Sequence, residues 1–143
     1  MKLSINHFIL KASLLFCGLF FLLFTSCENN DEDMQPDTPM ETGNKKEFTM
    51  YSVSTGLSIG NASFRELEDK TTKVAITLSG LDPSASHPAH IHSNSAAKGG
   101  GIVISLENVD GTSGKSETIV AKMDDGTTIS YNEIIQFNGY VNV

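Results

Sequence analysis

The sequence predicts an antiparallel all-β domain, either a sandwich or a barrel, behind a secretory signal. Six or seven short apolar segments alternate with turn signals rich in Gly, Asn, Asp and Pro, as expected for such a domain. Val74, Ile76 and Leu78 alternate with less apolar neighbours, which is the period of a strand with one buried face. No repeat of solenoid length is present, so a repeat architecture is not expected.

The expected elements begin at residue 47 and run to the last residue. Glu68-Asp69-Lys70 reads as a charged turn that joins two strands as a hairpin. Ser130 and Glu133 have the spacing of a capping box, which predicts one short helix over 130–137 with one apolar side. Strands are expected at about 48–53, 58–67, 72–79, 88–92, 102–106, 117–123 and 140–143.

Residues 1–26 have the composition of a secretory signal peptide. Lys2 and Lys11 precede an apolar run from Ala12 to Phe24, and small residues follow it. This run is shorter than the roughly 20 apolar residues that a bilayer-spanning helix needs. We therefore expect a cleaved signal; a retained N-terminal membrane anchor is the alternative.

The end of the signal resembles a bacterial lipobox. The sequence Leu23-Phe24-Thr25-Ser26-Cys27 places a cysteine directly after small residues, and the resemblance implies cleavage before Cys27 and attachment of lipid to it. Cys17 lies in the removed segment, so the mature chain has no pair of thiols for an internal disulfide. Several acyl chains on one residue would anchor the protein stably in a membrane.

Residues 27–46 are expected to form a disordered acidic tether, because they include the run Glu28–Asp33 and almost no apolar residue. An acidic run after a lipidated cysteine also resembles the surface-export signal of Bacteroidetes lipoproteins; a plain solvated spacer is the alternative. We expect the outer membrane or the cell surface as the location. Without the signal the chain has 8 basic and 17 acidic residues, a net charge of −9, which disfavours nucleic acid as a partner.

Three histidines between Leu81 and Gly101 are the candidate metal ligands. His90 and His92 are two residues apart, which on a strand places both imidazoles on one face and allows them to converge on copper or zinc. His87 precedes a proline and is the candidate third ligand. The alternative is that the histidines only make hydrogen bonds to the backbone.

No catalytic set accompanies the histidines. Ser84, Ser86, Ser93 and Ser95 lie close in sequence, but no nucleophile elbow or orienting acid is present. The glycines at 99–101 lack the spacing of a phosphate-binding loop and precede a strand. The sequence therefore favours a binding or structural module over an enzyme.

Four segments together resemble the CHRD domain, a family named from chordin and widespread in bacterial secreted proteins. They are Leu78–Leu81, His90–His92, Gly101–Leu106 and Gly139–Val143. The resemblance spans about residues 48–143 and implies a Greek-key β-sandwich similar to copper/zinc superoxide dismutase. Two of the copper ligands of that enzyme would match His90 and His92. Its other ligands, its arginine and its cysteine pair have no counterpart here, so dismutase activity is not expected.

The family pattern usually continues beyond the segment that matches Gly139–Val143, with a histidine and a further strand or two. We therefore expect the domain at 47–143 to be incomplete, with a third metal ligand lying beyond Val143. An exposed last strand predicts self-association by edge pairing, or a protein partner. The expected function is a lipid-anchored binding or structural module; a copper- or zinc-binding protein is the alternative.

Overall fold

The structure is a computed structural model that describes residues 38–143. The predicted signal peptide (1–26), Cys27 and most of the predicted tether lie outside the described residues. Within 38–143, no helix is long and apolar enough to cross a membrane.

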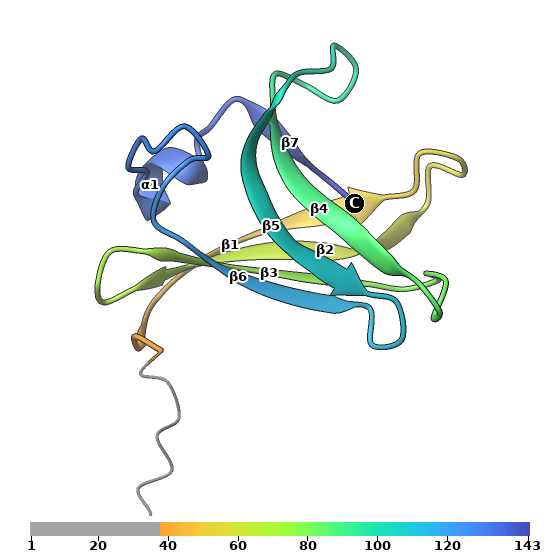
Figure 1. Ribbon diagram of the computed structural model, residues 1–143, viewed down its shortest axis with the longest axis horizontal. Helices are drawn as coiled ribbons and strands as arrows, with labels where there is room; N and C mark the ends of the chain where they lie inside the picture. The colour runs from red at the N-terminus through yellow and green to blue at the C-terminus, as the bar shows by residue number, and fades with distance from the viewer. Residues whose placement is uncertain (1–37) are drawn as a thin grey trace, which may run out of the picture. The chain divides into compact units, whose positions relative to one another are not determined.

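Seven strands form one antiparallel sheet in the order β1-β2-β3-β6-β5-β4-β7. The sheet curls, so that β4, β5 and β7 cross over β1, β2 and β3 (Figure 1). The all-β prediction is confirmed, whereas the two-sheet sandwich is not, since all seven strands belong to one sheet. The strands are β1 Glu41–Tyr51, β2 Ser58–Leu67, β3 Thr72–Leu78, β4 Ser86–Ser93, β5 Ile102–Asp110, β6 Lys115–Val120 and β7 Gly139–Asn142.

The hairpin of β2 and β3 shows how the sequence pattern determines the register. Val74, Ile76 and Leu78 are buried, while the residues between them are partly or fully exposed. Val74 lies opposite Phe64, and Ile76 lies opposite Ala62, so both strands turn their apolar residues to the same side. The predicted hairpin is confirmed.

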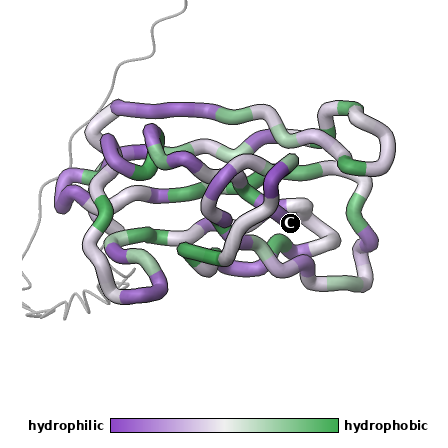
Figure 2. Tube along the Cα trace, turned by 90° about the horizontal axis from the view of Figure 1, so that it is seen from above, coloured by the Kyte–Doolittle hydropathy of each residue, from purple (hydrophilic) through white to green (hydrophobic). Residues whose placement is uncertain are grey.

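The hydrophobic core lies inside the curl of the sheet. Hydrophobic and hydrophilic residues alternate along the chain, as Figure 2 shows. The apolar residues of the inner face form a single cluster. Its buried members are Ala62, Phe64, Val74, Ile76, Leu78, Ala89, Ile91, Ile104, Leu106, Val109, Val120, Ile129, Tyr131, Ile134.

The short helix α1 (Tyr131–Ile134) begins at the predicted capping residue. The backbone N–H and the hydroxyl of Ser130 both donate to the Glu133 carboxylate, at 2.8 and 2.7 Å. These bonds lower the pKa of Glu133, because they stabilise its ionised form. The helix is one turn long, shorter than the predicted 130–137, and buries Tyr131 and Ile134.

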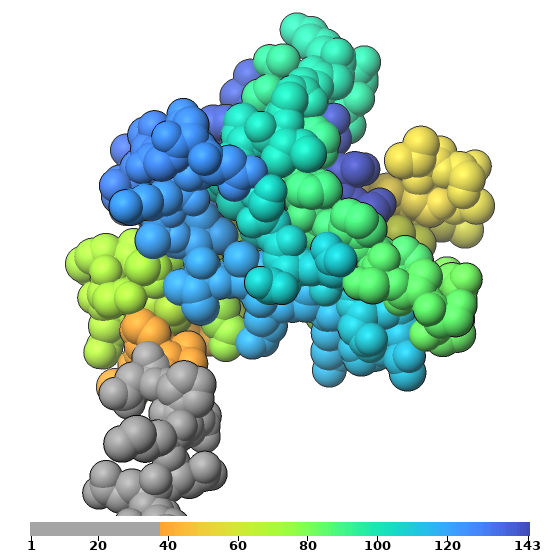
Figure 3. Space-filling model, in the orientation of Figure 1, coloured from red at the N-terminus to blue at the C-terminus, as the bar shows by residue number. Residues whose placement is uncertain are grey.

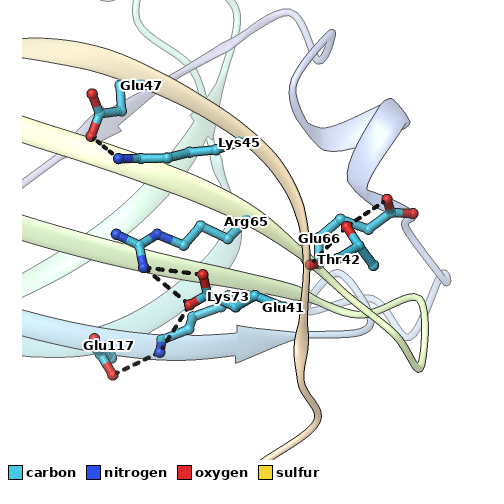
Figure 4. A network of polar contacts seen from close by, with 8 residues as sticks. All are labelled: Glu41, Thr42, Lys45, Glu47, Arg65, Glu66, Lys73 and Glu117. Atoms are coloured by element: carbon cyan, nitrogen blue, oxygen red, sulfur yellow. Dashed lines mark hydrogen bonds and ion pairs between the residues drawn. The ribbon is translucent and has the colours of Figure 1, made fainter.

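Strand β1 begins at Glu41, six residues before the predicted start of the domain. The reason is a set of polar contacts with β2 and β3 that composition does not reveal (Figure 4). The Glu41 carboxylate accepts from Arg65 at 3.0 Å and lies 3.5 Å from the Lys73 amine. Asn44 donates to the Glu66 carboxylate at 2.7 Å. Residues 41–46 therefore belong to the sheet rather than to the tether.

Candidate functional site

Strand β4 brings His90 and His92 together. Their ring centroids lie 5.9 Å apart in an edge-on arrangement. Ala89 and Ile91, which alternate with them, are buried on the opposite side of the strand. The pair therefore lies on the face of β4 that points away from the core.

The environment of His92 fixes its tautomer. Nδ1 lies 3.0 Å from the Gly100 carbonyl oxygen, and because a carbonyl only accepts, Nδ1 must carry the proton. The other ring nitrogen, Nε2, carries a lone pair in the neutral imidazole, and this atom is buried without a hydrogen-bond partner. A Cβ at Gly100 would lie 2.0 Å from the Ser93 carbonyl oxygen, so only glycine lets the loop approach this closely.

The ring of Tyr140 from β7 stacks on His92, with centroids 5.0 Å apart and an interplanar angle of 18°. Tyr140 lies opposite His92 in the pairing of β4 with β7, so the ladder itself produces the stack. The imidazole of His92 is therefore held from two sides, by a carbonyl and by an aromatic face.

His87 does not join the pair. It lines a cleft on the inner side of the sheet together with Ile91, and its Nε2 lies 3.3 Å from the Asp82 carbonyl oxygen. The Asp82 carboxylate accepts from the hydroxyl and N–H of Ser84, at 2.7 and 2.9 Å, and these bonds lower the pKa of Asp82. The prediction that His87 acts as a third ligand beside the pair is therefore not supported by this arrangement.

The described residues contain no group of three or more His, Cys, Asp or Glu side chains that could hold a metal ion. His90 and His92 supply two donors, whereas a closed tetrahedral zinc site needs four. The fit to copper or zinc is thus partial: the pair has one oriented imidazole with an available lone pair, and the remaining ligands would have to come from elsewhere.

A cleft of about 720 Å³ lies between the second half of β1 and strand β7. Residues 48–51 of β1 form one wall, 139–142 of β7 form the other, and Ile134, Ile135 and Phe137 contribute to its lining. No Asp, Glu, Lys or Arg is among the lining residues.

In the space-filling view the C-terminal residues lie beside the loop that follows β1 (Figure 3). Tyr51 is 61% exposed at the cleft wall.

Both walls of the cleft are edges of the sheet. Among residues 38–143, β1 pairs only with β2, and β7 pairs only with β4. Each edge therefore has backbone N–H and C=O groups without a strand partner. Sequence reasoning expected the last strand to be exposed, and β7 is an edge of the described sheet, but it missed the cleft because strand patterns do not indicate that β1 forms the other edge.

Comparisons with protein-family models, with curated proteins and with solved structures found no match. The resemblance to the CHRD domain therefore remains a prediction from the sequence motifs alone.

Proposed function

We propose that the protein is a lipid-anchored, non-catalytic binding module of the cell envelope, and that the cleft between β1 and β7 is its binding site. The observation that carries this proposal is the cleft itself: about 720 Å³, open, and lined without a single formal charge from Asp, Glu, Lys or Arg. Its volume lies within the range of known ligand pockets, which are mostly apolar with a few polar groups.

The chemistry of the lining favours binding over catalysis. The cleft offers one imidazole, that of His87, together with hydroxyl groups of serine, threonine and tyrosine. Nucleophilic catalysis needs a base within hydrogen-bond reach of the nucleophile. The hydrogen bond of His87 goes to the backbone carbonyl of Asp82 rather than to a hydroxyl group of the lining.

The binding half of the proposal is tested with Nile red, a neutral dye that fluoresces in apolar sites. We expect saturable binding of one dye per chain. Tyr51→Glu should weaken it several-fold, because it removes the aromatic surface of the cleft wall and adds a carboxylate there. Ile119→Glu is the matched control, since Ile119 is 45% exposed on β6 and lies outside the cleft lining. Equal loss in both variants, or no dye binding at all, would refute the cleft as the site.

The anchoring half rests on Cys27 and its lipobox-like context. The full chain, produced in a bacterium that processes lipoproteins, should float with membranes in a density gradient. Cys27→Ser should release it into the soluble fraction, because the lipid has no other attachment point. Unchanged flotation of the serine variant would favour the retained N-terminal anchor over lipid anchoring.

A second candidate function is metal binding by His90 and His92. It is favoured by one observation: His92 Nδ1–H is held by a carbonyl while Nε2 is buried and lacks a partner. Metal-binding histidines are commonly oriented in this way through their other ring nitrogen. Calorimetric titration with zinc or copper tests it: His90→Ala with His92→Ala should abolish binding, and His87→Ala should leave it unchanged.

A further inference from the structure

We propose that the turn between β1 and β2, residues 52–57, inserts into the interfacial layer of a zwitterionic phospholipid bilayer. This turn is called the tip below, and its apolar side chains are those of Val53 and Leu57. This inference rests on the anchoring half of the proposed function, because the lipid on Cys27 would bring the domain to a membrane. It follows from the exposure of the tip, its lack of charge, its internal hydrogen bonds and the reach of the N-terminal chain.

The tip exposes large apolar side chains to solvent. Val53 is 100% exposed and Leu57 is 68% exposed, and Tyr51 at the end of β1 is 61% exposed. The tip projects from the rest of the described domain, as Figure 1 shows. A strand added to the edge of β1 would pair with residues 41–51, and the tip lies beyond them. Exposed apolar side chains that gather at one place mark a surface for contact with a protein or a membrane.

The tip also lies in a long uncharged stretch. No Asp, Glu, Lys, Arg or His occurs from Phe48 to Phe64, although 19% of the residues of the chain are charged. The turns after β2, β3 and β4, by contrast, contain Glu68–Lys70, Asp82 and Lys98. Charged side chains are costly to move from water into a bilayer, so the tip is the one of these four turns that is suited to enter. Because the tip has no basic residue, its contact does not need anionic lipid.

The tip pairs many of its own hydrogen-bonding groups. The N–H of Ser52 donates to the Leu57 carbonyl at 2.9 Å, and the N–H of Gly56 donates to the Ser52 carbonyl at 2.8 Å. The N–H groups of Thr55 and Leu57 donate to the hydroxyl oxygens of Ser52 and Thr55, each at 3.3 Å. Polar groups without a partner are costly in an apolar layer. The tip can therefore enter the interface with these four N–H groups still paired.

Tyr51 is placed to lie at the surface of the bilayer while the tip enters it. Tyrosine is enriched at membrane–water interfaces, because its ring is apolar and its hydroxyl is polar. The nearest charged residue of β1 is Glu47, six residues before Val53, which is about 20 Å at strand spacing. Interfacial segments enter to a depth of about 5–10 Å. Insertion to this depth would leave the charges of β1 in water.

The N-terminal chain is long enough to bring the lipid and the tip to one membrane. Cys27 and Glu41 are 14 residues apart, which allows a separation of at most about 50 Å. Glu41 and Val53 are 12 residues apart along β1 and the start of the tip, which is at most about 40 Å. A lipid on Cys27 and the tip can therefore enter the same bilayer, with β1 between them.

The test uses a fluorophore at the tip. The chain contains no tryptophan, so Val53→Trp supplies a signal from this position alone. The full chain, as a bacterium that processes lipoproteins produces it, is reconstituted into phosphatidylcholine vesicles. We expect the emission of Val53→Trp to shift to shorter wavelength and to be quenched by bromine on the acyl chains. Ile119→Trp is the matched control, because Ile119 is 45% exposed on β6 and lies in the row that contains Lys45, toward the other end of β1.

Variants of Leu57 in the Val53→Trp background sharpen the test. Leu57→Asp should abolish both the shift and the quenching, because a carboxylate is costly in the interface. Leu57→Ser keeps the tip uncharged and should reduce the quenching less than Leu57→Asp does. Ile119→Asp adds the same charge outside the tip and should leave both signals unchanged. Circular dichroism of each variant verifies that the sheet is retained.

The outcomes separate this inference from the proposed function. If Cys27→Ser releases the chain from membranes but the emission of Val53→Trp does not change on vesicles, anchoring stands and insertion of the tip is refuted. If Cys27→Ser still floats and Val53→Trp is quenched, lipid anchoring fails and insertion stands. Equal quenching of Ile119→Trp refutes insertion by the tip.

Two further results would assign the tip to another contact. A shift that grows with protein concentration in the absence of vesicles would assign the tip to a second copy of the chain and refute the proposal. Quenching that high salt abolishes would assign the contact to charge, against the uncharged tip, and would also refute it.

Discussion

The two halves of β1 share one ladder with β2 but have opposite chemistry. The first half, Glu41–Glu47, is charged: Lys45 lies 2.6 Å from Glu47, and Glu41 contacts Arg65 and Lys73 (Figure 4). The second half, Phe48–Tyr51, has no charge and forms a wall of the cleft. Charged side chains on an edge strand discourage pairing with other chains. The comparison indicates that one half of this edge is protected by charge and the other half is not.

The ion pairs of the first half of β1 contribute little to the free energy of unfolding. Lys73 lies 3.5 Å from both Glu41 and Glu117, but Glu41 and Glu117 are 39% and 64% exposed. Exposed pairs of this kind typically contribute at most about 1 kcal/mol. These charged side chains also cover the edge of the sheet at residues 41–47.

The largest expected effect comes from the core behind both halves. Ile76 is 1% exposed and lies opposite Ala62, whose partner in β1 is Phe48. Ile76→Ala should lower the free energy of unfolding by about 2–5 kcal/mol, because it removes buried methyl groups and leaves a cavity. Urea unfolding followed by circular dichroism measures this. Thr77→Ala, at the exposed neighbour, should change it by less than about 0.5 kcal/mol.

A smaller effect is expected when the protected half is made to resemble the open one. Lys45→Val with Glu47→Val removes two charges from the edge, so the chain should associate as its concentration rises. Light scattering against concentration measures this. Lys98→Val serves as the control, since Lys98 is exposed in the loop between β4 and β5, away from the β1 edge. Association of both variants to the same extent would show that the edge charges have no special role.

The smallest effect is expected from pH. Bonds from Arg65 lower the pKa of Glu41, and bonds from Asn44 lower the pKa of Glu66, both from an ordinary 4.5. The unfolded chain then binds more protons than the folded one, so stability is fully present above about pH 4.5 and falls as the pH drops below it. Urea midpoints between pH 3 and 6 measure the slope. Glu41→Gln should make it shallower; an unchanged slope would contradict this assignment.

The sequence predicted the elements whose signals are local. The alternation of Val74, Ile76 and Leu78 predicted β3, and the spacing of Ser130 and Glu133 predicted the start of α1. Residues three apart on a continuous strand point to opposite faces, so a strand that included residue 87 would have predicted that His87 and His90 lie on opposite sides. We predicted the strand from residue 88, whereas β4 begins at Ser86, and so this signal was missed.

The features that the sequence did not predict depend on distant contacts. Glu41 joins the sheet through Arg65, which is 24 residues away in the sequence. The composition of the residues around Glu41 therefore could not predict this contact. The cleft depends on which strands become edges, which is a property of the order β1-β2-β3-β6-β5-β4-β7. Whether the sheet forms a two-layer sandwich or one curled layer also depends on this order.

The position of β1 has a mechanical consequence. The described chain enters the sheet at Glu41, and the cleft begins at Phe48, seven residues further along the same strand, or about 23 Å. Tension between the N-terminal side of the chain and a ligand held in the cleft would run along β1. Such a load shears the β1–β2 ladder, so its hydrogen bonds resist together instead of opening one after another. A load applied at Glu41 is thus resisted by the β1–β2 ladder as a whole.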